Sequence, residues 1–126
     1  MPFTKLLEVN NLTTSFGFGK EGLNAIEDIN FSVSKGETIA IVGESGSGKS
    51  VTSLSVMRLI SGKGKIKQGE AIFYKDDKAV DLFQLSEKEM RAYRGKELAM
   101  IFQEPMTSLN PVYTCGQQVA EPLRLH

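Results

Sequence analysis

Histidine and cysteine are almost absent from this chain. Its 126 residues include one cysteine, Cys115, and one histidine, His126, which is the last residue, and there is no tryptophan. A single cysteine forms no internal disulfide, and no cysteine and histidine spacing typical of a metal site is present. These absences argue against a histidine-based catalytic triad, a histidine general base and a zinc site within this chain.

An excess of charge of one sign is also missing. Fifteen Lys and Arg residues balance fifteen Asp and Glu residues, so the formal net charge is zero. Nucleic-acid-binding domains have a basic surplus, and disordered acidic chains have an acidic one. We therefore expect no nucleic-acid partner. Apolar residues make up 40% of the sequence, enough for the core of one domain or part of one.

The sequence has no long apolar run. Its start lacks the apolar stretch of a signal peptide. Stretches such as residues 39–42 are far shorter than the roughly 20 residues that span a bilayer. The sequence therefore predicts a soluble, cytoplasmic chain that can still dock on a membrane protein.

Strand patterns dominate the N-terminal part. Short β-like runs at 5–9 and 12–16 flank a turn at Asn10-Asn11. Apolar and polar residues alternate over 29–34, which is typical of a half-buried strand. Residues 38–42 are continuously apolar and β-branched, which predicts a strand covered on both faces, as in a parallel sheet.

Turn and helix signals organise the rest of the chain. Runs at 70–74 and 79–82 flank a polar turn and predict a hairpin. Apolar residues three apart predict a helix over 49–60. The apolar run at 98–102 predicts a further strand, and a loop is expected over 103–112.

Two later helices are predicted from capping patterns. Ser86 is followed three residues later by Glu89, and Thr114 by Gln117. A Ser or Thr followed at this spacing by Glu or Gln is typical of a helix N-terminus. We expect the second of these helices to be kinked or shortened at Pro122.

The chemistry of the chain is concentrated in residues 43–50. They read Gly-Glu-Ser-Gly-Ser-Gly-Lys-Ser and fit the pattern G-x-x-x-x-G-K-[ST] of a phosphate loop, also called Walker A. The glycines allow backbone N–H groups to point inward around an anion, and the helix that begins at Lys49 adds its positive end. The Lys49 ammonium can reach the β- and γ-phosphates, and the Ser50 hydroxyl can ligate Mg²⁺. A buried-type strand before the loop and a helix after it favour nucleotide binding over a flexible Gly/Ser loop.

Three blocks of sequence together resemble the ATP-binding subunits of ABC transporters. They are residues 29–37, the phosphate loop 43–50, and residues 100–111, Met-Ile-Phe-Gln-Glu-Pro-Met-Thr-Ser-Leu-Asn-Pro. The last block, with 85–91 before it and 117–123 after it, resembles the oligopeptide, dipeptide and nickel importer branch. The resemblance covers essentially the whole chain. It implies an α/β fold, a P-loop NTPase of ABC type with an N-terminal antiparallel β subdomain.

The resemblance also implies how the chain is organised. Residues 1–126 would be the N-terminal part of one ATP-binding domain: mainly antiparallel β in 1–37 and 70–82, P-loop core in 38–60 and 98–103, and the Q-loop with the start of a helical subdomain in 104–126. The family's signature sequence, Walker B strand with its catalytic glutamate, and switch histidine have no match here. We therefore expect the chain to be truncated before the helical subdomain is complete.

Two further roles follow from the resemblance alone. Gln103 would be the Q-loop glutamine, a catalytic residue that also ligates Mg²⁺, helps to place the attacking water and relays motion to the membrane subunits. Phe16 would stack on adenine, for which a flat aromatic face suffices. Phe16 and Phe18 flank Gly17, and the alternative is that either is a core or edge aromatic.

The predicted site combines the motif and the resemblance. In the family a threonine commonly follows the Walker A serine, and Val51 departs from this pattern, although its backbone N–H and the Thr52 hydroxyl can still donate. The predicted metal ligands are Ser50 and Gln103. The predicted cofactor-binding residues are Phe16, Gly43, Glu44, Ser45, Gly46, Ser47, Gly48, Lys49, Ser50, Val51 and Thr52.

The expected function is that of the ATP-binding, energy-coupling component of an ABC importer for peptides or similar small solutes. The cofactors would be ATP and Mg²⁺. The partners would be membrane-spanning permease subunits and a second ATP-binding subunit, at the inner face of the cell membrane. The chain alone is expected not to hydrolyse ATP and to self-associate through open sheet edges. The alternatives are a non-catalytic nucleotide-binding or interaction fragment and a P-loop kinase of another class.

Overall fold

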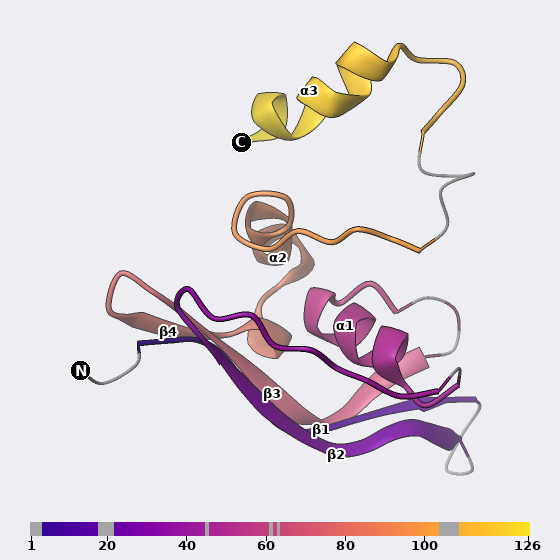
Figure 1. Cartoon of the computed structure of the whole chain (residues 1–126), viewed down its shortest axis with the longest axis vertical. Coiled ribbons are helices and arrows are strands. Elements are labelled where there is room, and N and C mark those ends of the chain that lie inside the picture. The colour runs from indigo at the N-terminus through magenta and orange to yellow at the C-terminus, as the bar shows by residue number, and fades with distance from the viewer. Residues whose placement is uncertain (1–3, 18–21, 45, 61, 63, 104–108) are drawn as a thin grey trace. The chain divides into compact units, whose positions relative to one another are not determined.

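The structure is a computed structural model that describes residues 4–17, 22–44, 46–60, 62, 64–103 and 109–126. These residues form two compact units, which divide after Gln84. The first unit contains β1 (Lys5–Phe16), β2 (Leu23–Ser34), α1 (Lys49–Met57), β3 (Gly64–Lys75), β4 (Lys78–Asp81) and the 3₁₀ turn η2 (Leu82–Gln84). The second contains α2 (Glu87–Tyr93) and α3 (Cys115–Leu125) (Figure 1).

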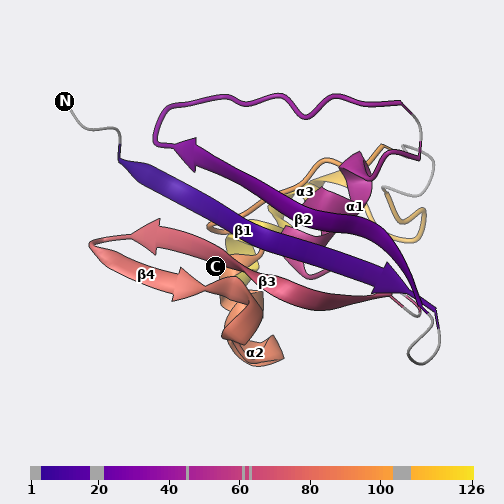
Figure 2. The ribbon, with the colours of Figure 1, turned by 90° about the horizontal axis from the view of Figure 1, so that it is seen from below.

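The first unit is built on a four-stranded antiparallel sheet with the order β2-β1-β3-β4. In Figure 2 the three long strands cross the view side by side, and β4 folds back along β3. The predicted hairpin is present, because β3 and β4 pair from Ile72 with Asp81 to Lys75 with Lys78. Strand β3 begins at Gly64, earlier than the predicted start at residue 70.

The N-terminal strand differs from the prediction of two short runs around a turn. Residues 5–16 form one strand, β1, that carries a bulge at Asn11, where φ is 52°. The pairing register with β2 shifts between Val9 and Leu12. The backbone N–H of Asn11 is satisfied by the side chain of Asn30, with 2.9 Å between Asn11 N and Asn30 Oδ1. The left-handed backbone of Asn11 therefore forms a bulge within β1 and does not end the strand.

Helix α1 lies against one face of this sheet (Figures 1 and 2). Its buried residues are Thr52, Ser55, Val56 and Met57. On the sheet side, the buried apolar side chains are Val9, Leu12, Ile26, Ala71 and Phe73. Burying each large apolar side chain contributes about 1.5–3 kcal/mol. The helix is shorter than the predicted 49–60 because Arg58 adopts a left-handed φ of 55° that ends it.

A pair of hydroxyl groups joins α1 to the central strand β1. Thr14 Oγ1 lies 2.8 Å from Ser55 Oγ, and both residues are fully buried. The Ser55 hydroxyl donates to the carbonyl oxygen of Val51, one turn earlier in α1, over 2.6 Å. Since a hydroxyl has one proton, the Thr14 hydroxyl is the donor to Ser55. The pair thus fixes α1 on the sheet at one defined position.

This pair leads to a stability prediction. The Ser55→Ala substitution leaves the buried Thr14 hydroxyl without its acceptor, so the free energy of unfolding should fall by about 1–3 kcal/mol. In the double variant Thr14→Val, Ser55→Ala, both polar groups are removed, and most of the loss should be recovered. Urea denaturation of the variants and of the parent chain measures this. A double variant that is less stable than Ser55→Ala alone would contradict it.

Two predicted strands are absent from the structure. Residues 38–42 and 98–102 carry no strand assignment, apart from a single bridge between Arg94 and Leu98. Most of their large apolar residues are exposed, Val42 to 87% and Ile101 to 98%, whereas Leu98 and Met100 are half-buried. A strand exists only where a neighbour accepts and donates its backbone hydrogen bonds. Among the described residues, no strand pairs with either segment, so these two predictions were wrong for this structure.

The second unit confirms both helix starts. Ser86 Oγ accepts from the backbone N of Glu89 over 3.1 Å and precedes α2. Thr114 and Gln117 form a full capping box before α3, with 3.2 Å between Gln117 N and Thr114 Oγ1. Helix α3 continues through Pro122 to Leu125 and is not shortened there. Within the described part of the chain, no helix is both long and apolar enough to span a membrane.

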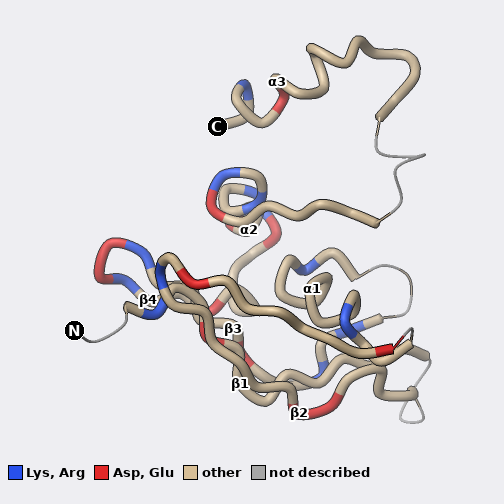
Figure 3. The backbone as a smooth tube through the Cα atoms, in the orientation of Figure 1, with Lys and Arg blue, Asp and Glu red and all other residues tan. Residues whose placement is uncertain are grey.

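A polar cluster centred on Glu8 links β1 to β3 on the sheet surface. Its carboxylate accepts from Lys5 Nζ at 3.0 Å, from Asn10 Nδ2 at 3.3 Å and from the Tyr74 hydroxyl at 3.1 Å. These donors, led by Lys5, hold the pKa of Glu8 below its ordinary value. The hydrogen bond to Glu8 raises the pKa of Tyr74. Charges of both signs also meet at the neighbouring β3–β4 turn (Figure 3).

The lowered pKa of Glu8 has a consequence for pH dependence. Because the folded state favours the ionised carboxylate, the stabilisation is fully present above the pKa of the unfolded chain. It is lost as the pH falls through the lower pKa of the folded chain. Tyr74→Phe removes one donor, so the pKa of Glu8 should rise toward its ordinary value, as measured by an NMR titration of the carboxyl carbon. Tyr113→Phe, in the second unit, is the control and should leave this pKa unchanged.

Candidate nucleotide-binding site

The predicted phosphate loop lies between an extended segment and the start of α1. Residues 37–44 contain no helix or strand, Gly48 is the N-cap of α1, and Lys49 and Ser50 are its first residues. Inside the loop, the backbone N–H of Ser47 donates to the carbonyl oxygen of Glu44 over 3.0 Å. Ser45 lies outside the described residues. The helix N-terminus therefore stands at the loop, as phosphate binding requires.

Gly48 fixes the loop to the sheet. It adopts a φ of 100°, in the left-handed region that favours glycine. A Cβ at this position would lie 2.5 Å from Cγ2 of Ile26 and 3.3 Å from the carbonyl oxygen of Ala25. Both neighbours belong to β2, and Ile26 is buried. The backbone of the loop thus packs directly on β2, with no room for a side chain between them.

The Lys49 side chain folds back over the loop. Its ammonium donates to the carbonyl oxygen of Gly43 and, over 2.9 Å, to that of Glu44. Two carbonyl dipoles therefore hold a full positive charge beside the loop backbone. An anion that approaches the N-terminus of α1 meets this ammonium and the helix dipole together. The arrangement is electrostatically suited to phosphate.

The residues after Lys49 differ in how accessible they are. Ser50 is exposed at the first turn of α1, and Val51 is half-buried. Thr52 is buried, and its hydroxyl donates to the carbonyl oxygen of Gly48 over 2.8 Å. The Thr52 hydroxyl is therefore already engaged in this structure, which leaves Ser50 as the accessible hydroxyl of the two.

A cavity of about 380 Å³ borders the loop. Ser47, Gly48 and Lys49 line one part of it, and the other lining residues are mainly apolar side chains of β2 and of the extended segment 39–42. The phosphate loop therefore lies at the edge of an apolar groove and not on a flat surface.

Phe16 lies at the end of β1, within the same unit as the loop. Its cross-strand partner on β3 is Gly64, and its side chain is 37% exposed. A Cβ on Gly64 would lie 2.5 Å from Cε1 of the Phe16 ring. The ring thus rests on the backbone of Gly64, with part of its surface open. Phe18, on the other side of Gly17, is outside the described residues.

Gln103 belongs to the second unit, where it is exposed. The block that contains it is described only in part, because residues 104–108 lie outside the described range. Its predicted contacts with metal and water stay predictions.

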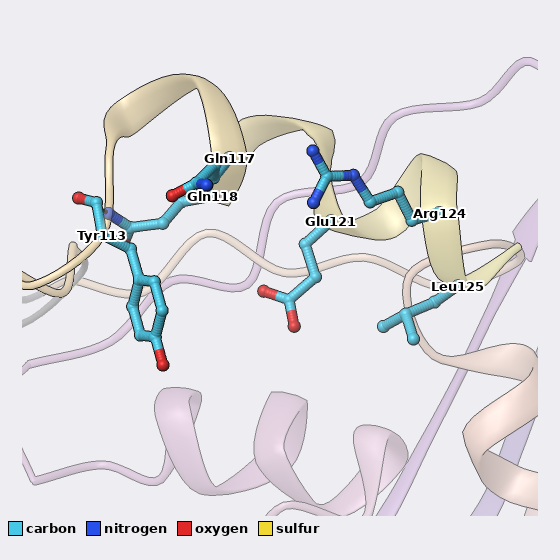
Figure 4. A pocket seen from close by; sticks show the side chains of 6 residues that line it. All are labelled: Tyr113, Gln117, Gln118, Glu121, Arg124 and Leu125. Carbon is cyan, nitrogen blue, oxygen red and sulfur yellow. Dashed lines mark hydrogen bonds between the residues drawn. The ribbon is translucent and has the colours of Figure 1, made fainter.

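A polar hollow of about 500 Å³ runs along α3 and contains none of the predicted site residues. Figure 4 shows Tyr113 and Glu121 pointing to the same side of the helix, with Gln117 and Arg124 nearby. Gln118 lines the hollow too, but its amide is occupied by the backbone, with its nitrogen 2.9 Å from the carbonyl oxygen of Asn110. This residue therefore braces the turn before α3.

The sequence profile of the ABC transporter family matches residues 26–123, most of the chain. The chain belongs to this family. The predicted resemblance to its ATP-binding subunits is confirmed by relatives over nearly the whole chain. The glutathione import ATP-binding protein GsiA of Pectobacterium atrosepticum is 51% identical over 128 residues, covering 100% of this chain. The oligopeptide transport ATP-binding proteins AppD and OppD of Bacillus subtilis are 54% and 53% identical over 96% and 98% of it.

The relatives are much longer than this chain. It spans 20% of GsiA, 36% of AppD and 34% of OppD. Among solved structures, the dimeric ATP-binding cassette MJ0796 bound to ADP and Pi is similar with a TM-score of 0.73 and 27% identity. The match covers 95% of this chain and 47% of that one. The predicted fold class, a partial ABC-type P-loop NTPase with an antiparallel β subdomain, is confirmed.

Sequence reasoning missed the residues that support the predicted site. Ile26 and Ala25 lie behind Gly48, and Gly64 lies beneath Phe16. The pattern over 29–34 did predict a strand here, but the predicted strand began too late to include Ile26. For Gly64, the sequence contains no such signal, because residues 65–68 do not alternate between apolar and polar.

Two glycines of the loop allow a matched test of how it is held. Gly46 and Gly48 both have positive φ, 85° and 100°, but a Cβ on Gly46 would meet open space. Gly46→Ala should therefore cost only the left-handed strain of about 1–2 kcal/mol. In the Gly48→Ala variant the new methyl group must in addition displace Ile26, so the free energy of unfolding of this variant should be clearly lower than that of Gly46→Ala. Chemical denaturation compares the two variants, and equal losses would show that the packing on β2 is unimportant.

Proposed function

We propose that this chain is part of the ATP-binding component of an ABC importer for peptides or similar small solutes, and that residues 43–50 bind the phosphates of ATP. The observation that carries the proposal is the loop itself. The backbone of Gly48 packs against β2, and Lys49, whose ammonium donates to loop carbonyl oxygens, is the first residue of α1. The relatives named above, which are peptide and glutathione import proteins, support the solute class.

The residues present fit a nucleotide with its metal. The Lys49 ammonium would leave the two carbonyl oxygens for the β- and γ-phosphates, and backbone N–H groups of the loop would hold phosphate oxygens. The exposed Ser50 hydroxyl would be a ligand of Mg²⁺, which when bound neutralises phosphate charge. Val51 would contribute its backbone N–H, Phe16 would stack on the adenine and Gln103 would act as the Q-loop glutamine.

The proposed setting is a larger assembly. Permease subunits and a second ATP-binding subunit would complete it at the inner face of the membrane, and the dimeric form of the similar cassette supports this pairing. We propose that this chain alone binds ATP without hydrolysing it, because hydrolysis also requires a positioned water and charge stabilisation around the γ-phosphate. An interaction fragment is the second candidate for this chain, and the exposed apolar residues Val42 and Ile101 favour it.

A titration with Mg-ATP tests the central proposal. Lys49→Ala removes a charge-assisted contact with phosphate, so the affinity for Mg-ATP should fall by about ten-fold or more. Calorimetry of the parent chain and of this variant measures the change.

The matched control is Lys67→Ala, which removes an equal charge from an exposed position on β3. Its affinity should be unchanged. If the two variants lose the same affinity, binding reflects general charge, and if the parent chain binds no Mg-ATP, the proposed function is wrong for this chain.

A further inference from the structure

We propose that Gly64 is a positioning residue for base recognition. Together with Ile60 it forms a floor under the ring of Phe16, and this floor holds the ring where its outer face can stack on the purine base of the nucleotide. The inference rests on the proposed function, since it concerns the base of the same ligand whose phosphates residues 43–50 would hold.

The floor is seen in the packing around Gly64. Phe16 and Gly64 are cross-strand partners at the ends of β1 and β3. A Cβ on Gly64 would lie 2.5 Å from Cε1 and 3.0 Å from Cδ1 of the Phe16 ring, and it would also overlap Cγ2 of Ile60. The ring edge and the isoleucine methyl group therefore meet over the bare backbone of Gly64.

The glycine is required here for space and not for its backbone conformation. Gly62 and Gly69 nearby have positive φ, of 68° and 113°, whereas Gly64 has none. An alanine could adopt the backbone of Gly64 without strain, but its methyl group would occupy the volume of the ring and of Ile60. The ring can lie this close to β3 only above a residue without a side chain.

Part of Phe16 is accessible. The residue is 37% exposed, although the four residues before it in β1 are all buried. An aromatic ring that is held at one edge and partly exposed is suited to stacking, which needs only a fixed flat face. Figure 2 shows the start of β3 beside the end of β1, and Phe16 and Gly64 are the paired residues at these two ends.

Ile60 connects the floor to the phosphate loop. It follows α1 after the left-handed turn at Arg58, and Leu59 N donates to the carbonyl oxygen of Leu54 over 2.9 Å. The helix that begins at Lys49 therefore ends next to the residue that supports Phe16. One rigid element would set the spacing between the phosphate and base contacts.

The test uses two probes, ATP and inorganic tripolyphosphate, which has the phosphates but no base. Gly64→Ala should weaken ATP binding by about five-fold or more, the low end of the value of a base–aromatic stack. Tripolyphosphate affinity should be unchanged. The control is Gly116→Ala, which adds the same methyl group where a Cβ meets open space, and it should affect neither probe.

A double-variant cycle with Phe16→Ala decides whether Gly64 acts through the ring. If it does, Phe16→Ala weakens ATP binding to a similar extent, and adding Gly64→Ala to it causes no further loss. The proposal would be overturned if the fold-losses of ATP affinity from Phe16→Ala and Gly64→Ala multiplied in the double variant. It would also be overturned if Gly64→Ala weakened tripolyphosphate binding as much as ATP binding. Ile60→Ala, which thins the floor without adding an atom, should also weaken ATP binding selectively.

Unfolding measurements keep this inference separate from the proposed function. Gly64→Ala should lower the thermal midpoint of the parent chain, and it should lower that of Phe16→Ala less, because the clash with the ring is then gone. If the parent binds no Mg-ATP, the proposed function and the base-recognition role both fail, whatever the packing. If ATP binds but the unfolding cycle shows no coupling between Gly64 and Phe16, only the positioning role fails.

Discussion

The position of helix α1 on the sheet is the constraint on which the rest of the candidate site depends. The buried Thr14–Ser55 pair sets where the middle of the helix lies on β1. At its start, Gly48 rests directly on Ile26 of β2. A phosphate loop is a short stretch of backbone that has little packing of its own, so its shape is inherited from the elements at its ends. Here the antiparallel sheet supplies that support through the backbone of Gly48, and the Lys49 side chain adds contacts with the carbonyl oxygens of Gly43 and Glu44.

The same dependence explains the two strands that do not form. The apolar, β-branched runs at 38–42 and 98–102 have the composition of buried parallel strands. Composition favours an extended backbone, but hydrogen-bond partners must come from neighbouring strands, and parallel neighbours are usually remote in sequence. Among the described residues such neighbours are missing. The extended segment 38–42 consequently keeps its apolar side chains largely open to solvent.

Whether a structural feature could be predicted from the sequence depends on how far apart in the chain the interacting residues lie. Features set by neighbouring residues were predicted well: the capping residues Ser86 and Thr114, the β3–β4 hairpin and the start of α1 at Lys49. Features set by contacts across the fold were missed. The bulge at Asn11 was predicted as a turn, because asparagine with a left-handed backbone is common in turns and in bulges alike. The two are distinguished here by the hydrogen bond from the Asn11 backbone N–H to the Asn30 side chain. The support under Gly48 and Phe16 depends on β2 and β3, and no local pattern reveals it.

The contacts of Lys49 bear on how the loop would bind phosphate under the proposed function. In this structure the Lys49 ammonium donates to two carbonyl oxygens of the loop. These contacts hold the positive charge beside the loop backbone. A phosphate must compete with them, so the net gain from Lys49 is the difference between two charge-assisted arrangements and not the full value of one. Neutral carbonyl oxygens are weaker partners for an ammonium than phosphate oxygens are, so the exchange still favours the ligand. Under the proposed function, the loop would keep its cation available at a modest cost in affinity, and the packing of Gly48 on β2 would hold the backbone in place while the side chain moves.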